Sequence, residues 1–205
     1  MSSNNRKEEI IMATLKLASE NGIKAISMSM IANEVGIKKA SLYNHFSSKE
    51  ELFEEMYHFL RDKAKEAAQI KPIDYEVLFK NKTAFEIINS TVNNYLNLNK
   101  QANMRAFYKL IYSERCYNKF AAKILSEETD RMIYATKQLF YAMEVHHLLH
   151  FNDLEMSAIS FALSIHGLMD YQEDSSFDDA DNSNKCKLLL NSFITWFCQE
   201  NSVEE

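Results

Sequence analysis

The chain has 205 residues, 46% of them hydrophobic, with only three Gly and one Pro. This composition supports a buried core but supplies few turn residues, so it disfavours strand-rich folds and predicts an all-α protein. The three cysteines have no metal-ligand spacing, which argues against a metal cluster. The chain has no apolar run of about eighteen residues and no apolar segment after its charged N-terminus, which argues against a membrane span and a signal peptide. We therefore expect a cytoplasmic protein.

The net charge of −6 is unevenly distributed along the chain. Residues 1–49 hold seven Lys and Arg against four Asp and Glu, whereas the rest of the chain holds 16 against 25. The stretch 36–49 contains Lys38, Lys39 and Lys49 and no acidic residue. A basic end on an acidic body favours a domain that meets nucleic acid.

Two helices are predicted at the N-terminus. Apolar residues at i, i+3, i+4 spacing indicate a first helix over about residues 5–21, which Gly22 ends as a left-handed cap. Ser27 is a good N-cap for a second helix over 28–35, and Gly36 follows its last periodic residue.

Two further helices follow directly. A short third helix covers 38–44, and a serine at 47 or 48 begins a fourth over 48–68, with capping-box spacing from Ser48 to Glu51. The only proline, Pro72, marks the expected boundary between modules.

Longer patterns follow Pro72. They predict helices over roughly 75–98, 103–112, 115–146, 153–172 and 184–199, with an acidic loop over 175–181 before the last one. We therefore predict an N-terminal three-helix domain (1–50) and a larger helical domain (51–205), with helix 48–68 connecting the two.

The second and third helices form a helix-turn-helix pattern, because two short helices meet through a glycine with an apolar residue just after it. A small core can fix the angle between them: Ala32, Ile37, Leu42 and Phe46. The third helix would then enter the major groove of DNA, where base edges are distinguishable.

The residues from Ala32 to Leu52 resemble the signature of the tetracycline-repressor (TetR) family of bacterial regulators. The portion Leu-Tyr-x-His-Phe-x-x-Lys-Glu-x-Leu, which begins at Leu42, matches that signature at each specified position. The resemblance covers about residues 6–60, and the later helices match the family in number and length.

The resemblance implies a set of DNA contacts. Tyr43, Lys49 and one of the serines that begin the second helix would contact phosphates, whereas the third helix would face base edges or flanking phosphates. Tyr43 and His45 have the alternative of packing inside the domain, and Lys38 stands where the family often has a hydroxyl residue, so it cannot cap the helix. The predicted DNA-facing set is Ser27, Ser29, Lys38, Lys39, Ser41, Tyr43, Asn44, His45 and Lys49.

The C-terminal helices are candidates for dimerisation, because two copies on a symmetric dimer match a palindromic operator. Helices 153–172 and 184–199 are apolar on more than one face, and the resemblance implies a four-helix bundle between two copies; ordinary intrachain core is the alternative. The predicted interface residues are Phe161, Ile165, Leu168, Leu189, Phe193 and Phe197.

Aromatic and Met residues are dense in the middle of the chain, where the family commonly carries a small-molecule pocket. An apolar or amphipathic effector fits such a lining. The predicted pocket residues are Phe59, Met104, Phe107, Tyr108, Ile111 and Tyr134. The resemblance implies that the effector moves the fourth helix and so releases the protein from DNA.

Two histidine patterns suggest other chemistry. His146, His147 and His150 cluster near one helix end, and Glu-x-x-His occurs at Glu55 and Glu144, as in ferritin-like di-iron bundles. The first of these motifs directly follows the helix-turn-helix, so we predict no metal, no cofactor and no catalysis. The sequence thus predicts a DNA-binding regulator, a repressor released from a palindromic operator by a small molecule, with a di-iron enzyme and a ligand-independent regulator as alternatives.

Overall fold

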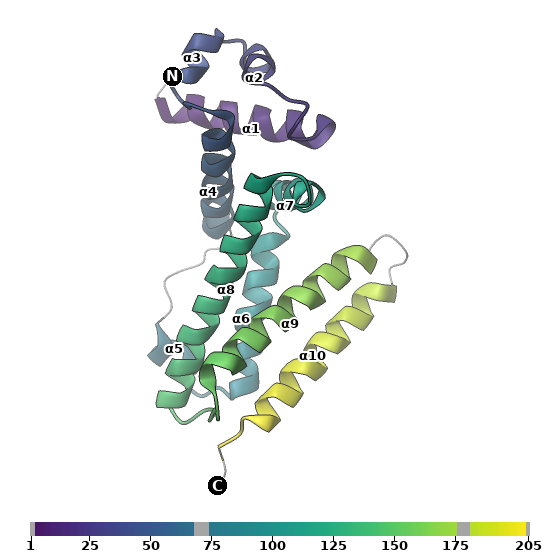
Figure 1. Ribbon diagram of the computed structural model, residues 1–205. Coiled ribbons are helices and arrows are strands. Elements are labelled where there is room, and N and C mark those ends of the chain that lie inside the picture. The colour runs from purple at the N-terminus through teal and green to yellow at the C-terminus, as the bar shows by residue number, and fades with distance from the viewer. Residues whose placement is uncertain (1–2, 68–73, 176–180, 204–205) are drawn as a thin grey trace. The chain divides into compact units, whose positions relative to one another are not determined.

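The computed structural model describes residues 3–67, 74–175 and 181–203, and ten helices lie within these ranges (Figure 1). The all-α prediction is confirmed. The helices are α1 (Ser3–Asn21), α2 (Met28–Val35), α3 (Lys39–Tyr43), α4 (Lys49–Ala67), α5 (Tyr75–Phe79), α6 (Ala84–Asn99), α7 (Ala102–Glu114), α8 (Lys119–Val145), α9 (Leu154–Ser175) and α10 (Asp181–Glu200). Pro72 and most of the predicted acidic loop lie outside the described residues.

The chain folds into two compact units. The first comprises residues up to Ile70 together with Asn97–Ser126, and the second comprises Lys71–Leu96 and Glu127–Glu205. Helices α4 and α7 thus belong to the same unit as the N-terminal helices. Helix α8 begins in the first unit and ends in the second.

The first unit has one continuous apolar core, because each of its helices turns an apolar stripe inward. The stripe of α1 is buried at Ile10 and Ala18, and that of α4 at Leu52 and Met56, each with none of its surface exposed. Helix α7 adds Phe107, which is also fully buried.

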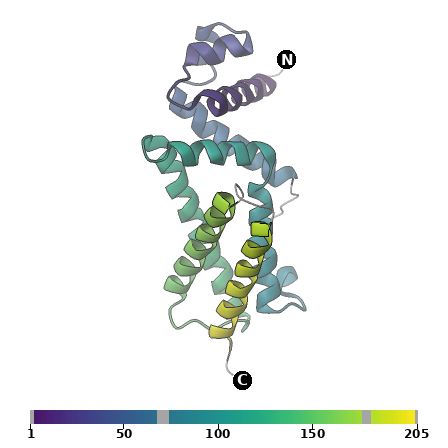
Figure 2. The same cartoon turned by 90° about the vertical axis from the view of Figure 1, so that its right-hand side faces the viewer.

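The second unit is built around an aromatic cluster. Phe140 on α8 stacks on Phe151 and Phe197 with ring centroids 4.9 and 5.3 Å apart, and Phe161 on α9 lies 4.8 Å from Phe197 on α10. Helices α9 and α10 run side by side in this unit (Figure 2). Such ring pairs add to the stabilisation that their burial gives.

The predicted helix over 75–98 is wrong in one respect, because the structure breaks it into α5 and α6. Asn81 adopts a left-handed φ of 55°, which ends the helical path. Thr83 then begins α6 with a capping box: its backbone N–H donates to Glu86 at 2.8 Å, and the N–H of Glu86 donates to the Thr83 hydroxyl at 3.2 Å. The sequence carried this Thr-x-x-Glu signal.

The predicted helix over 115–146 also begins later than expected, at Lys119. The Asn118 side chain accepts from the backbone N–H of Phe120 at 3.0 Å, which is an N-cap interaction. Among the described helices, none combines the length and apolar character that crossing a membrane would need.

Candidate nucleic-acid interface

Local signals place α2 and the turn after it. Ser27 is extended and its hydroxyl accepts from the N–H of Met30 at 3.3 Å, so it caps α2 as expected. Gly36 has a φ of 72°, a conformation that side chains with a Cβ rarely adopt. The N–H of Ile37 then returns to the Ala32 carbonyl at 2.9 Å, which closes the end of the helix.

Helix α3 is held against α2 by buried apolar side chains. Ile31 and Leu42 have no exposed surface, and Ala32 and Phe46 are each 1% exposed. The prediction that Leu42 and Phe46 belong to the core is confirmed. Because these side chains fix the helix, the residues between them on α3 turn outward.

Four of the nine predicted DNA contacts lie exposed on α3 or directly beside its ends. Lys38, Lys39, Tyr43 and Asn44 are exposed, and the Lys39 ammonium lies 5.9 Å from the centre of the Tyr43 ring. This places a cation beside an exposed tyrosine ring. Of the remaining predicted residues, Ser27 is exposed, whereas Ser29, Ser41 and His45 are half-buried.

Lys38 precedes α3 in an extended conformation, with a φ of −69° and a ψ of 143°. Its side chain makes no capping hydrogen bond, as expected of a lysine, which has no acceptor. Lys38 therefore contributes positive charge at the start of the helix without stabilising its first turn.

Lys49 is placed differently from the other lysines. Its half-buried ammonium donates to the carbonyl of Ile23 at 2.9 Å and to that of Ile26 at 3.1 Å. Two of its three N–H groups therefore hold the turn between α1 and α2. The sequence signature did not reveal this structural role.

The N-terminus of α4 is stabilised by a modified capping box. The Ser48 hydroxyl accepts from the N–H of Glu51 at 3.0 Å, whereas the Glu51 carboxylate accepts from both the backbone N–H of Ser47, at 2.6 Å, and its hydroxyl. Each serine thus makes one half of the capping box: Ser48 accepts from the N–H of Glu51, and Ser47 donates to the Glu51 carboxylate. The hydrogen bonds from Ser47 lower the pKa of Glu51 below its ordinary value.

Glu114 joins this domain from the end of α7. Its carboxylate accepts from the backbone N–H of Ile23 at 3.2 Å, although the two residues are 91 positions apart. Sequence reasoning missed Glu114, since no local motif links it to the helix-turn-helix.

The six residues predicted to line an effector pocket do not all lie in the same unit. Met104, Phe107 and Ile111 are buried in the core of the first unit, and Phe59 and Tyr108 pack against that core. Tyr134 is 65% exposed and belongs to the second unit. Five of the six residues therefore share one region, where α4 packs against α7.

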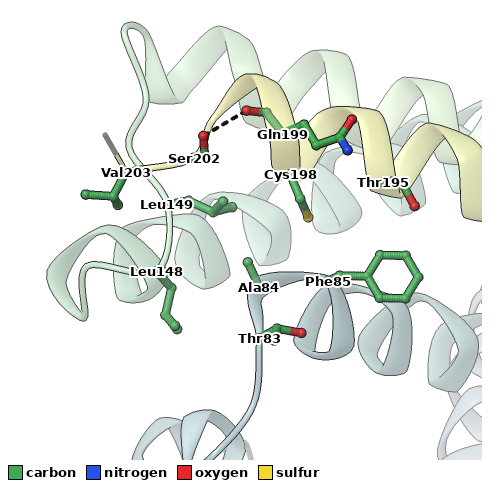
Figure 3. Close-up of a pocket in the computed structure, with 10 residues that line it drawn as sticks. All are labelled: Thr83, Ala84, Phe85, Leu148, Leu149, Thr195, Cys198, Gln199, Ser202 and Val203. Atoms are coloured by element: carbon green, nitrogen blue, oxygen red, sulfur yellow. Dashed lines mark hydrogen bonds between the residues drawn. The ribbon is translucent and has the colours of Figure 1, made fainter. Parts of the chain in front are cut away.

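A separate groove of about 580 Å³ lies in the second unit (Figure 3). It is formed by the start of α6, the segment between α8 and α9, and the end of α10 with the residues that follow it. Its lining is apolar at Phe85 and Leu149, with the hydroxyl and amide groups of Thr195 and Gln199 around them. Burial raises the pKa of the Cys198 thiol, which also lines the groove, to about 11.

The predicted dimer residues split into two groups. Phe161, Ile165 and Phe197 are at most 6% exposed and belong to the core of the second unit, so they serve intrachain packing. Leu189 is 41% exposed, and Leu168 and Phe193 are partly buried against that core.

Other apolar side chains of the same two helices face outward. They are Met156 (54% exposed) and Leu163 (49%) on α9, and Leu188 (67%) and Trp196 (53%) on α10. We call these four residues the outer face of α9 and α10.

The three histidines near the end of α8 lie in different local environments. His146 packs edge-on against Phe79 with ring centroids 5.0 Å apart, His147 has a φ of 55° just after the helix, and His150 lies 3.6 Å from Glu144. In the described part of the chain, no group of three or more His, Cys, Asp or Glu side chains is arranged to hold a metal ion.

The glutamates of the two Glu-x-x-His motifs are also engaged in contacts within the chain. Glu55 pairs with Lys7 at 3.3 Å, and Glu144 accepts from the backbone N–H of Phe151 at 3.2 Å.

These features define a helical protein with an N-terminal helix-turn-helix, and the comparisons with known proteins agree. The profile of "Bacterial regulatory proteins, tetR family" matches residues 10–56. Nucleoid occlusion factor SlmA of Photobacterium profundum is 41% identical over 59 residues, which cover 28% of this chain and 30% of that protein. The match to this curated relative thus spans less than a third of its length.

Solved structures resemble the chain over nearly its whole length. The Flavonoid-responsive Regulator FrrA has a TM-score of 0.73 at 20% identity and covers 99% of this chain and 100% of its own. Salmonella enterica GusR has a TM-score of 0.68 at 18% identity, with 97% and 98% covered. The N-terminal domain, residues 10–56, thus matches the tetR family of bacterial regulatory proteins, and the fold of the whole chain resembles that of solved TetR-family regulators.

Proposed function

We propose that this chain is a sequence-specific DNA-binding transcriptional regulator that binds a palindromic operator as a homodimer. The observation that carries the proposal is the outward face of α3, where Lys38, Lys39, Tyr43 and Asn44 are exposed beside a helix-turn-helix of the tetR family. Lysine neutralises phosphates and can donate to guanine, and asparagine can pair with adenine. One three-helix head offers few base contacts, so two heads on a dimer supply the specificity.

The outer face of α9 and α10 supports the dimer. Along α9, Met156, Ser160, Leu163 and Gly167 recur at helical spacing and are all exposed. A Cβ added at Gly167 would meet no neighbouring atom within 4 Å, so intrachain packing does not require a glycine there. Small residues beside exposed apolar ones allow a partner helix to approach closely.

We further propose that an apolar or amphipathic small molecule releases the protein from DNA. The supporting region is the packing of α4 against α7, where Phe59, Met104, Phe107, Tyr108 and Ile111 gather. A ligand that wedges between these helices would displace α4, which carries Lys49 at its start. The solved neighbour FrrA, named as flavonoid-responsive, is consistent with a flat aromatic effector.

Selection of bound duplexes from a random library tests the DNA-binding proposal. We expect enrichment of an inverted repeat with half-sites about one helical turn apart. A double variant with Lys39→Ala and Asn44→Ala is the control, and it should enrich a weaker or degenerate site. Failure of the wild-type chain to enrich any repeated sequence would overturn the proposal.

Release by a ligand is tested on that operator. A panel of neutral aromatic compounds, flavonoids included, is screened for compounds that raise the melting temperature and dissociate the complex. A Phe107→Trp variant, which fills the proposed site, should lose the response. If no compound in the panel weakens operator binding, the flat aromatic class is rejected.

A further inference from the structure

The turn between α1 and α2 is held from two sides at a single residue. The backbone N–H of Ile23 donates to the Glu114 carboxylate at 3.2 Å, and the carbonyl of Ile23 accepts from the Lys49 ammonium at 2.9 Å. The same ammonium reaches the carbonyl of Ile26 at 3.1 Å. One charged group from α7 and one from α4 thus hold consecutive peptide groups of this turn.

The surroundings leave the turn little freedom to shift. Ile23 and Ile26 are 3% and 2% exposed, so both are anchored in the core. Gly22 has a φ of 82°, and a Cβ built there would lie only 3.1 Å from the Glu114 carboxylate. On the surface, the Lys24 ammonium lies 5.5 Å from the centre of the Tyr117 ring, three residues after Glu114.

The turn between α1 and α2 directly precedes the helix-turn-helix. Ile26 is followed by Ser27, which caps α2, and α2 packs on α3. Glu114 is the last residue of α7, and the chain then enters α8, which continues into the second unit. Lys49 is the first residue of α4. Both helix ends therefore contact Ile23, and Lys49 also contacts Ile26, which directly precedes the Ser27 cap of α2.

We propose that Glu114 and Lys49 form a two-point clamp that fixes the turn between α1 and α2 and so positions α2 of the helix-turn-helix. In this proposal Glu114 is a positioning residue: it sets the entry angle of α2 and touches no DNA. Its contribution is to operator affinity and not to general attraction for phosphate, because a carboxylate repels phosphate. The proposal rests on the DNA-binding function proposed above, and it assigns a positioning contact to that same site.

The test uses the full chain with Glu114→Ala, Glu114→Gln and the matched control Glu54→Ala. Glu54, in the same unit, makes an ion pair with Lys123 at 3.0 Å, away from the helix-turn-helix sequence. Amide hydrogen exchange at Ile23, melting temperature, and affinity for the selected operator and for a non-specific duplex of equal length are measured for each variant.

We expect Glu114→Ala to speed exchange at Ile23 and to weaken operator binding about tenfold, the scale of one hydrogen bond to a charged group, with non-specific affinity unchanged or slightly raised. Glu114→Gln should be intermediate, because its amide oxygen still accepts, and Glu54→Ala should resemble wild type. Melting temperatures are the check that the Glu114 variants remain folded.

Unchanged exchange at Ile23 would show that the clamp does not exist. Faster exchange with unchanged operator affinity would show that the clamp does not position α2. Equal losses on operator and non-specific DNA would assign Glu114 to general stability and overturn its positioning role. If the wild-type chain has no operator while exchange responds to Glu114→Ala, the proposed function has failed and the clamp is a purely structural contact.

Discussion

Lys39 and Lys49 belong to the same signature region, but their different environments give them different roles. Lys39 is exposed on α3 beside Tyr43, where its charge is free to meet a phosphate. Lys49 is half-buried and donates to two backbone carbonyls. A lysine that holds carbonyls contributes to stability first, with its remaining N–H and its charge available to DNA.

Replacement of each lysine by alanine separates these roles. Lys39→Ala should lower the slope of log affinity against log salt by about one while leaving stability unchanged. Lys49→Ala should lower the free energy of unfolding by about 1–3 kcal/mol, because carbonyls in a partly buried turn lose a charged donor. Binding over a salt series and urea unfolding measure the two effects; equal stability of both variants would contradict the structural role of Lys49.

At the scale of single elements, caps and turns decide where each helix begins. Ser27 and Gly36 bound α2, Ser48 and Glu51 start α4, and Thr83 with Glu86 separates α6 from α5. Hydrogen bonds to Glu51 and Glu86 favour their ionised forms and lower both pKa values. These caps are therefore sensitive to acid.

Acid should weaken the start of α4. A carboxylate whose pKa is lower in the folded chain stabilises the fold above its unfolded pKa, near 4.5, and this contribution is lost as the pH falls through the folded value. Glu51→Gln should therefore flatten the fall in stability below about pH 4.5. Urea unfolding between pH 3 and pH 7, steps of about one unit apart, checks the slope; an unchanged acid limb would reject the role of Glu51.

The turn after α1 offers a second test. Gly22→Ala should lower the free energy of unfolding by about 1–2 kcal/mol, because its φ of 82° is unfavourable for a side chain with a Cβ. Asn94→Ala, at an exposed position inside α6, is the control, and it should leave stability unchanged or raise it by about 0.5 kcal/mol because alanine has the higher helix propensity. Urea unfolding at one protein concentration compares them; equal effects would contradict the argument.

At the scale of the whole molecule, the second unit exposes large apolar side chains on its last two helices. The outer face of α9 and α10 is exposed although its helices already bury Phe161 and Phe197 in their own unit. Exposed apolar patches of this kind mark protein–protein interfaces. In the proposed homodimer, each copy would contribute one helix-turn-helix domain.

Charged substitutions on this face should dissociate the proposed dimer. The double variant with Leu163→Glu and Trp196→Glu should sediment as a monomer and lose cooperative binding to the palindrome, while each half-site is still bound weakly. Val145→Glu, at a 74% exposed site on α8, is the control and should stay dimeric. A double variant that remains a dimer would place the interface elsewhere.

By itself the sequence determined the helical fold, the helix-turn-helix at 28–44 and its buried residues Leu42 and Phe46. It could do so because caps, glycine turns and helical periodicity act over a few residues. The break before α6 also has a local sequence signal, the capping box of Thr83 and Glu86. The apolar pattern over 75–98 nevertheless led to the prediction of one continuous helix.

Only the tertiary structure decided the contacts between distant segments. Lys49 could not be assigned to the carbonyls of Ile23 and Ile26, nor Glu114 to the N–H of Ile23, because these pairs form only when the helices pack. The same holds for α9 and α10, where an apolar residue such as Phe161 or Leu163 fits either face of a helix until its neighbours are in place. Packing then assigned Phe161 to the core and left Leu163 on the surface, because each helix has a single face toward its own unit.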